Sequence, residues 1–499
     1  MDGHRSRKLD LEFVDTTTSS SRRLKRHRLA SAPSTSPGHR PASLEDLPED
    51  LLHGVVSRLT VKEAGRTSAL SSRWRNRWTY HSNLCFDGTC SDLAGYDAGR
   101  FVDHVTTVLQ RHSRLVVDRF ELRSPLLGKE HAHHLDRWFA FVASAKARHV
   151  TLDLSPPYYE ECVVASPNKY RLPESHQLVG IESLLLGHVC LELPPVPDGS
   201  QLLGFRALKK LELKFVADLG DLTHFIASCP ALEWLSISRS SISHFVVPRQ
   251  ASCLRYLRVD CPGVESIHLD ATSLTTFEYV GYPSVPIKTN EALKLSQASI
   301  LLYNWFGDAV GYFWDGLSSC LAPVDRLLLS LAMDAKTTAF TKNPTKFIHL
   351  RHLTLFCNVR EDPKSALAIL RLTQILESAP QLEHLVLHMD SFDQRASVLK
   401  TNDCVHLHPH VHHHLKTVQM TGMVGLSGQL ELAKYILLSA PVLEFMTLSL
   451  AKIRYRPIKS MSDYNYFTRL EKFAKNYLDP RRVYRDVLKN CRACNVTCH

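Results

Sequence analysis

The sequence predicts an α/β fold: a small unit of three helices followed by a solenoid, whose curved parallel sheet is connected by helical return segments. Two observations predict it. Between residues 44 and 80, apolar side chains fall at helical spacing in three successive stretches. Beyond residue 80, short apolar segments share one spacing and recur every 20 to 34 residues, which indicates stacked structural repeats.

Five segments divide the 499 residues of the chain. We expect a disordered basic tail over 1–42, the three-helix unit over 43–82, a repeat array over 83–412, the last repeats over 413–462, and a C-terminal cap and tail over 463–499. With 44% hydrophobic residues, the chain has ample material for a large core. No apolar run approaches the roughly 18 residues of a membrane helix, and the start shows no apolar signal segment. We therefore expect an intracellular protein without a membrane partner.

The first 42 residues are rich in Ser, Thr, Pro and Arg and poor in large apolar side chains, so they cannot offset the entropy of ordering. They hold nine Lys and Arg against four Asp and Glu, and thus supply five of the ten formal positive charges. The rest of the chain is only mildly basic, which argues against an extended nucleic-acid surface on the folded part.

A dense basic cluster lies within this tail and comprises Arg22, Arg23, Lys25, Arg26 and Arg28. Such clusters are typical of segments that bind nuclear import receptors. The alternative is a solvated charge run without a partner. We expect the protein in the nucleus, the cytoplasm or both.

The first two helices follow from spacing and capping. Apolar residues recur at steps of three and four from Leu47 to Leu59, and Pro48 fits the first helical position, where no backbone donor is needed. Thr60 and Glu63 have the spacing of a capping box, in which each side chain satisfies a free backbone donor. This box predicts a second helix that reaches about residue 70.

A third helix is predicted from Ser71 or Ser72, either of which can cap it. Trp74 and Trp78 lie four residues apart and would share one face of that helix. A unit of this size cannot bury all of its apolar side chains. Part of its apolar surface is therefore available to a partner.

Residues 44–80 resemble an F-box, especially the plant type, in the stretches LPEDLL and VKEAGRTSALSSRWRNRW. The resemblance implies docking on a Skp-family adaptor and, through it, membership of a cullin-based ubiquitin ligase. The alternative is a generic three-helix unit with no partner. By position, the resemblance assigns adaptor contact or its support to Leu47, Pro48, Leu51, Leu52, Val55, Leu59 and Trp74.

Three segments of the array are nearly superimposable: SCPALEWLSI at 228–237, SAPQLEHLVL at 378–387 and SAPVLEFMTL at 439–448. Each carries the L-x-x-L-x-L spacing of a leucine-rich repeat, and ten looser copies bring the total to thirteen. One unit cannot bury its leucines alone, whereas stacked units form a continuous core. Besides a weak copy near Leu295, the middle anchors are Phe120, Val150, Leu184, Leu211, Leu235, Leu257, Phe277, Leu327, Leu353, Leu385, Val418 and Met446.

The return segments show helical spacing at 133–147, 221–229, 365–379 and 429–440. The block from His414 to Leu450 resembles the FBD-type region that closes many plant F-box and leucine-rich-repeat chains, on the strength of LKTV and ELAKYILLSAPVLE. Residues 463–490 are predicted to form a last helical segment, which caps the open end of the stack.

Residues between the anchors alternate with them along each strand and are the ones available to a ligand. From three repeats we select Trp234, Tyr256, Arg258 and His384 as candidates for contact with a target protein. These inter-anchor residues show no single charge theme, so the sequence does not name the target.

Together, the resemblances imply a non-catalytic adaptor that holds a target protein beside a ubiquitin carrier, so that the transfer becomes nearly intramolecular. The first alternative is a leucine-rich-repeat scaffold that binds a protein or acidic polymer outside any ligase. The second is a metal-dependent enzyme that uses a histidine cluster. No phosphate-binding glycine loop, nucleophile elbow or H-E-x-x-H motif is present.

Two groups contain metal-binding residue types, although we expect no metal or other cofactor. In HLHPHVHHH at 406–414, the imidazoles of His406, His408 and His410 could share one side of a strand, but Pro409 interrupts it, which favours a solvated loop. The chain ends with Cys491, Cys494, Cys498 and His499, for which a frayed tail with free thiols is favoured. The 13 cysteines, an odd number, indicate reduced thiols rather than a disulfide framework.

The import prediction can be tested by replacing Arg22, Arg23, Lys25 and Arg26 with Ala in a fluorescent fusion. Because receptor binding depends on the density of positive charge, we expect the fluorescence to shift toward the cytoplasm. An unchanged distribution would support the solvated charge run.

Overall fold

The computed structural model describes residues 48–89, 97–113, 117–156, 168–172, 178–191, 205–290, 292–302, 311–333, 347–359, 369–391, 410–423, 428–449 and 495–498. The chain divides into two compact units, Met1–Pro48 and Glu49–His499, and nearly all described residues belong to the second. The basic cluster, Leu47 and the predicted capping segment 463–490 lie outside the described residues.

The described elements alternate between strands and return segments after an all-helical start. The helices are α1 (Glu49–Val56), α2 (Val61–Thr67), η2 (Arg77–Tyr80), α3 (Ala98–Arg111), η3 (Lys129–His131), α4 (Ala132–Ser144), α5 (Leu222–Ala227), the π-helical turn η7 (Tyr312–Leu317), α7 (Ser318–Leu321), α9 (Leu372–Glu377) and α10 (Gln429–Ser439). The large sheet contains β1 (Asn83–Asp87), β2 (Arg119–Arg123), β3 (His149–Asp153), β5 (Ser183–Gly187), β7 (Lys210–Lys214), β8 (Trp234–Ser238), β10 (Tyr256–Asp260), β12 (Thr276–Gly281), β14 (Gln297–Leu302), β15 (Arg326–Met333), β16 (His352–Val359), β17 (His384–Ser391), β18 (Thr417–Thr421), β19 (Phe445–Ser449) and β20 (Asn495–Cys498).

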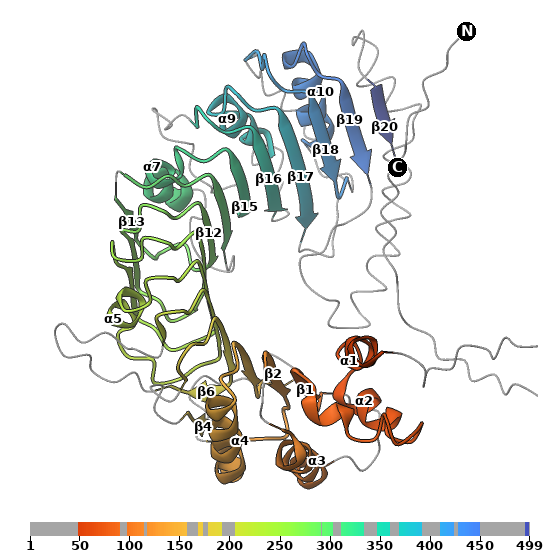
Figure 1. Ribbon diagram of the computed structural model, residues 1–499. Coiled ribbons are helices and arrows are strands. Elements are labelled where there is room, and N and C mark those ends of the chain that lie inside the picture. Colours follow the sequence, from red (N-terminus) through yellow and green to blue (C-terminus); the bar gives the residue numbers. More distant parts are fainter. Residues whose placement is uncertain are drawn as a thin grey trace, which may run out of the picture. The chain divides into compact units, whose positions relative to one another are not determined.

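The fifteen described strands of this sheet are all parallel and follow one another in chain order, as the continuous change of colour in Figure 1 shows. Helices α4, α5, α7, α9 and α10 lie on one side of it (Figure 1). We call this side the core face and the opposite side the open face. This arrangement confirms the predicted α/β solenoid.

The twelve middle anchors predicted from the sequence are all buried on the core face, and none exposes more than 3% of its surface. They also pair with one another in register, as Leu211 does with Leu235 and Leu235 with Leu257. The weak copy near Leu295 is the strand β14, with Ala298 and Ile300 in the core. The buried anchors belong to one hydrophobic cluster.

The sheet extends one strand beyond the predicted repeats at each end. At its start, β1 contributes Leu84 and Phe86 to the core. At its end, β20 pairs with β19, Asn495 opposite Phe445. The prediction of a frayed tail is therefore wrong for residues 495–498, because backbone hydrogen bonds to β19 order them.

The return segments are helical where predicted, at α4, α5, α9 and α10, but others contain strands. β9 (His244–Val247), β11 (Ser266–Leu269) and β13 (Ile287–Thr289) form a second parallel sheet in the order β13-β11-β9, and β4 (Tyr170–Arg171) pairs with β6 (Val189–Cys190) in a third. Successive anchors in this middle part, Leu235, Leu257 and Phe277, are only 22 and 20 residues apart. So few residues leave room for an extended return segment but not for a helix with two loops. These three repeats, for which no helix was predicted, therefore have extended return segments.

The predicted third helix of the N-terminal unit is instead a series of turns that ends in the short 3₁₀ helix η2. The Ser68 hydroxyl donates a hydrogen bond to the Arg75 carbonyl (2.6 Å), which an α-helix would use for the Thr79 amide. The Thr79 amide instead donates a hydrogen bond to the carbonyl of Asn76, three residues earlier in the chain (3.2 Å). The side-chain bond therefore favours the tighter helix.

Two further expectations concern the chemistry of the chain. The cysteines whose state the structure describes are free thiols, in agreement with reduced cysteines. Within the described ranges, no helix combines the length and the apolar character that crossing a membrane requires.

The register can be tested on β15, where three leucines follow one another. Leu329 exposes 1% of its surface on the core face, whereas its neighbour Leu328 is only partly buried, on the open face. We expect Leu329→Ala to lower the free energy of unfolding by roughly 2 to 5 kcal/mol, through lost transfer energy and a cavity. Leu328→Ala should cost less than about 1 kcal/mol. Denaturant titration of the full chain measures both, and equal effects would contradict the assigned faces.

Candidate functional site

Helices α1, α2 and η2, residues 49–80, form what we call the helical module. The predicted capping box is present: the Thr60 hydroxyl accepts a hydrogen bond from the Glu63 amide (3.3 Å), and the Glu63 carboxylate accepts one from the Thr60 amide (2.9 Å). The hydrogen bond from the Thr60 backbone lowers the pKa of Glu63. The box therefore fixes where α2 begins.

Glu49 in α1 joins the two ends of the module. Its carboxylate accepts a hydrogen bond from Nη2 of Arg73 (3.2 Å) and forms an ion pair with Arg77. Hydrogen bonds from Arg77 and Arg73 lower the pKa of Glu49. These groups are solvent-exposed, so we expect the contact to orient α1 against η2 more than to stabilise the fold.

Two buried histidines attach the helical module to the first strands. The amide of Asn83 donates to Nδ1 of His81 (3.0 Å), so Nε2 carries the proton that His81 donates to the Leu59 carbonyl (2.9 Å). In turn, Nε2 of His112 lies 2.9 Å from the His81 carbonyl. Burial lowers the pKa of His112. Both imidazoles thus act as neutral links between α1, α3 and β1.

The described residues assigned to adaptor contact differ in exposure. Pro48, Leu51 and Val55 are exposed, Leu51 by 55% and Val55 by 39% of their surface. Leu52 and Trp74 are buried, at 0% and 2% exposed, so they support the surface from below. Leu59 is partly buried. An apolar contact at α1 can therefore involve Leu51 and Val55 directly but not Leu52 or Trp74.

On the open face, side chains at the first, third and fifth positions of each strand point outward, and the parallel register aligns them in rows across the sheet. Just before the strands, charges of alternating sign form a ladder. Arg148 pairs with Asp118 (2.6 Å) and Lys209 with Glu182 (2.9 Å). Hydrogen bonding to Lys209 lowers the pKa of Glu182. Through this pairing the charges of the ladder largely cancel.

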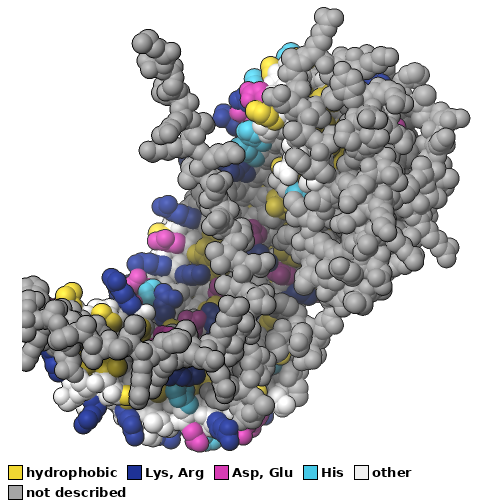
Figure 2. All heavy atoms as spheres, turned by 90° about the vertical axis from the view of Figure 1, so that its right-hand side faces the viewer, with side chains coloured by type: hydrophobic (Ala, Val, Ile, Leu, Met, Phe, Trp, Pro, Cys, Tyr) yellow, Lys and Arg dark blue, Asp and Glu magenta, His cyan; other side chains and the backbone are white. Residues whose placement is uncertain are grey.

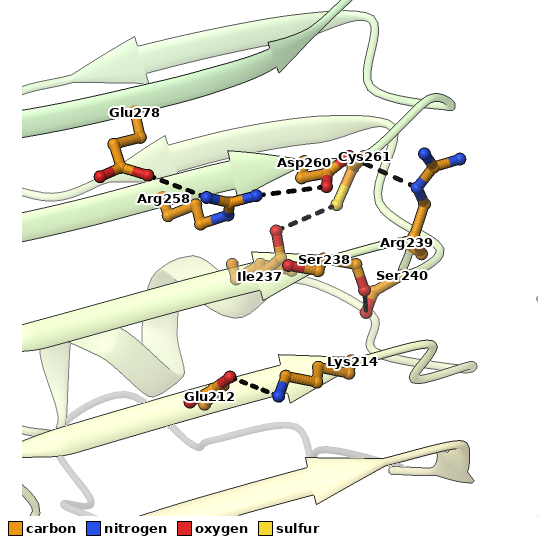
Figure 3. A network of polar contacts seen from close by, with 10 residues as sticks. All are labelled: Glu212, Lys214, Ile237, Ser238, Arg239, Ser240, Arg258, Asp260, Cys261 and Glu278. Atoms are coloured by element: carbon orange, nitrogen blue, oxygen red, sulfur yellow. Dashed lines mark hydrogen bonds and ion pairs between the residues drawn. The ribbon is translucent and has the colours of Figure 1, made fainter. Parts of the chain in front are cut away.

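A second polar network crosses the middle of the open face (Figure 3). Arg258 on β10 lies between two acids: its Nη1 is 2.9 Å from Glu278 and its Nη2 is 3.6 Å from Asp260. Asp260 also faces Arg239, at 3.5 Å. In Figure 2, basic and acidic side chains are interspersed over the middle of this surface. The acids at the centre of the face are thus already matched by cations.

An aromatic stack borders this network. The rings of Trp234 and Tyr256 are parallel within 2°, with centroids 4.9 Å apart, and Lys210 Nζ lies 4.3 Å from the Trp234 centroid. Burial, followed by the charge of Glu278, raises the pKa of Tyr256 to about 12, so the phenol remains protonated at neutral pH. Three of the four predicted target-contact residues, Trp234, Tyr256 and Arg258, therefore lie together on adjacent strands.

The fourth, His384, lies on β17 in a different environment. Its ring stacks on His352 (centroids 4.6 Å apart, 13° between planes), and its Nδ1 lies 2.7 Å from the Thr417 hydroxyl. Four residues further along the strand, His388 repeats this arrangement between Phe356 and Thr421, also 2.7 Å from the hydroxyl. Burial lowers the pKa of His388. This end of the open face therefore carries stacked rings on its strands, beside the ion pairs that Glu383 forms with Arg351 and Lys416 just before them.

The histidine segment is described only from residue 410 onward. The expectation of a solvated loop is wrong for His412, which exposes 3% of its surface and packs edge-on against Tyr435. Its backbone amide donates to the Ser439 carbonyl (2.7 Å), which fixes the segment on α10. Within the described ranges, no three His, Cys, Asp or Glu side chains lie close enough to hold a metal ion. His406, His408, Cys491, Cys494 and His499 lie outside those ranges.

Comparison with known families gives two matches. The family model described as "At1g61320/AtMIF1, LRR domain" matches residues 108–473, which is 366 of the 499 residues, and the F-box domain matches residues 44–86. The chain belongs to the F-box/LRR family. Its F-box match contains the whole helical module and most of β1, and its LRR match contains the stacked repeats.

The F-box/LRR chain has similar proteins in Arabidopsis thaliana. F-box/FBD/LRR-repeat protein At1g13570 is 24% identical over 431 residues, which cover 83% of this chain and 92% of the relative. F-box/LRR-repeat protein At3g58900 is 29% identical over 280 residues, 51% of this chain and 79% of the relative. F-box/FBD/LRR-repeat protein At1g78750 is 29% identical over 221 residues, 42% of this chain and 44% of the relative. The FBD in two of these names agrees with the resemblance of residues 414–450.

Sequence reasoning missed several surface residues of this F-box/LRR chain, exposed or partly buried. Leu70 and Tyr80 expose 59% and 52% of their surfaces at the edge of the helical module. On the open face, Lys210 stacks on Trp234 and Phe356 on His388. The two residues of each of these last two pairs lie opposite each other on neighbouring strands. Aligning the repeats strand by strand would therefore have found both pairs.

The burial of His412 predicts a pH dependence of stability. Burial lowers its pKa from 6.5 to about 4. Between these values only the unfolded chain binds the proton, so stability is complete above about pH 6.5 and falls as the pH decreases. Between pH 6.5 and 5, we expect the free energy of unfolding of the wild-type chain to fall by roughly 2 kcal/mol more than that of His412→Leu. Urea titration measures both. The other buried histidines are present in both chains, so their contributions cancel in the comparison. Equal losses of stability in both chains would contradict this prediction.

Proposed function

We propose that this chain is the non-catalytic substrate receptor of a Skp/cullin/F-box ubiquitin ligase. Its helical module binds the Skp-family adaptor, and through it the cullin, while the repeats bind a protein destined for ubiquitination. The observation that carries the proposal is the presence, in one compact unit, of an F-box with exposed apolar side chains on α1 and a repeat sheet with an exposed polar face.

The helical module has the surface that a helical adaptor requires. Leu51 and Val55 lie four residues apart on α1 and therefore on one face of the helix. Beneath them, Leu52 and Val56 are buried, so the exposed pair rests on a packed layer. Exposed apolar side chains with rigid support are typical of interface hot spots.

The repeats supply the second surface without depending on the first. Each strand of the sheet contacts only its neighbours, and a single core runs through all of them, so the open face is held by local packing. A target bound there stays near the ligase for as long as the complex lasts. The chain itself then only needs to raise the effective concentration of the target lysine.

The adaptor contact can be tested with Leu51→Asp. A carboxylate in the centre of an apolar interface is desolvated without a partner, so we expect Skp-family adaptor affinity to fall about 30-fold or more. The matched control is Leu438→Asp on α10, because Leu438 is also 55% exposed but lies in the repeats. It should bind the adaptor like the wild-type chain.

Calorimetry with the purified adaptor measures both affinities, and circular dichroism checks that both variants remain folded. Equal binding by Leu51→Asp and the wild-type chain would contradict the contact at α1. A wild-type chain that does not bind any Skp-family adaptor would leave only a repeat scaffold outside a ligase.

A further inference from the structure

The strand register reveals a charge pattern that the sequence order conceals. We call the residues at the first position of each strand of the large sheet the first row. From β7 to β15 the register aligns Lys210, Trp234, Tyr256, Thr276, Gln297 and Arg326. On the described strands β1 to β20, no residue of the first row is acidic. The acids of the open face occupy the other rows.

Those acids are largely matched by neighbouring cations. Glu278 and Asp260 face Arg258 at 2.9 and 3.6 Å. Glu212 lies 2.7 Å from Lys214 and 4.0 Å from Lys210, so one carboxylate serves two ammonium groups. After this pairing, one net positive charge remains at Lys210, where the stretch from β7 to β15 begins.

The other end of this stretch of the first row is Arg326. Its side chain is exposed, and it forms no ion pair with a described residue. Its neighbours in the row are Gln297 and His352, and the charge of Arg326 contributes to the lowered pKa of His352, after burial. Arg326 therefore offers a guanidinium that can bind an incoming carboxylate in bidentate fashion.

The distance between the two cations suits an extended peptide. Five strand steps separate Lys210 from Arg326, and at about 4.8 Å per step they lie roughly 24 Å apart. An extended segment of about seven residues spans this distance at about 3.3 Å per residue. Beside Lys210, Trp234 and Tyr256 add aromatic surface, and the next position of the row holds the short side chain of Thr276.

We propose that the first row from Lys210 to Arg326 binds an extended acidic segment of the target protein. Carboxylates of Asp or Glu pair with Lys210 and Arg326, and an apolar side chain between them packs against Trp234 and Tyr256. The inference rests on the proposed function, because it assumes that the open face binds the target.

The same pattern argues against nucleic acid as the occupant. Each strand of double-stranded DNA carries a phosphate about every 3.4 Å along the helix axis, so roughly seven would lie along this distance. The stretch of the first row from Lys210 to Arg326 offers two permanent cations, and Glu212, Glu278 and Asp260 lie in the other outward rows, where they repel a continuous line of phosphates. Two separated carboxylates on a peptide match the two cations better.

The test is a display selection of random 12-residue peptides on the full chain. We expect the enriched peptides to contain Asp or Glu in excess, with two acids about seven positions apart and an apolar residue between them. The most enriched peptide is then synthesised with a fluorescent label, and its affinity is measured by anisotropy.

Three variants and one control complete the experiment. Lys210→Gln, Arg326→Gln and Trp234→Ala should each weaken peptide binding about tenfold or more. Arg119→Gln is the matched control, because Arg119 is an exposed basic residue of the same row on β2, outside the proposed stretch. Its affinity should stay within about twofold of the wild-type chain.

The inference is wrong if the selection yields no peptide above background or peptides without excess acid. It is also wrong if Lys210→Gln and Arg326→Gln bind as tightly as the wild-type chain, or if a 12-nucleotide uridine RNA displaces the peptide at equal concentration. Adaptor binding, measured on the same samples, separates this outcome from failure of the proposed function. A chain that binds the adaptor but not acidic peptides rejects only the inference.

Discussion

The structure depends on the in-register stacking of parallel strands, which places one leucine or other large apolar residue directly against its equivalent in the next repeat. Leu211, Leu235 and Leu257 form such a column, and each is buried almost completely. Because every unit is flanked on both sides, the return segments need only cover the core face, and they do so as helices or strands according to the residues available. The same register fixes the position of every outward side chain on the open face.

That open face has two regions with different chemistry. From β7 to β12 its charges are paired within and between strands, as Arg258 is with Asp260 on β10 and with Glu278 on β12, so the side chains are held in place by partners on the same surface. From β16 to β18 imidazoles stack on neighbouring rings and face threonine hydroxyls, with His384 and His388 in equivalent settings. A preorganised surface loses less side-chain entropy when it binds, which suits a receptor that must hold a partner in a fixed position.

Much of the fold could be predicted from the sequence because the same requirement for buried apolar side chains recurs at equivalent positions of every repeat. The leucine spacing identified the core anchors, and Thr60 with Glu63 identified the start of α2, since both signals are local. The η2 turn and the strands β9, β11 and β13 could not be predicted in this way. The η2 turn depends on a side-chain bond from Ser68. The strands depend on whether the 22 and 20 residues between anchors can form a helix once the repeats are stacked, which the apolar spacing alone does not decide. Trp234, Tyr256 and Arg258 were chosen individually, but only the register shows that they adjoin, and that the first row, to which Trp234 and Tyr256 belong, contains no acid on the described strands. The burial of His412 depends on its contact with α10, which lies further along the chain and which spacing does not reveal.

The central claim is that one chain carries two separate binding surfaces, the helical module for an adaptor and the open face for a target. Hydrogen–deuterium exchange of the full chain, with and without a purified Skp-family adaptor, tests this claim most directly. Our account predicts slower exchange of amides in residues 49–80 on adaptor binding, with unchanged exchange in the strands from β7 to β18. Protection in those strands, or none in the helical module, would contradict it.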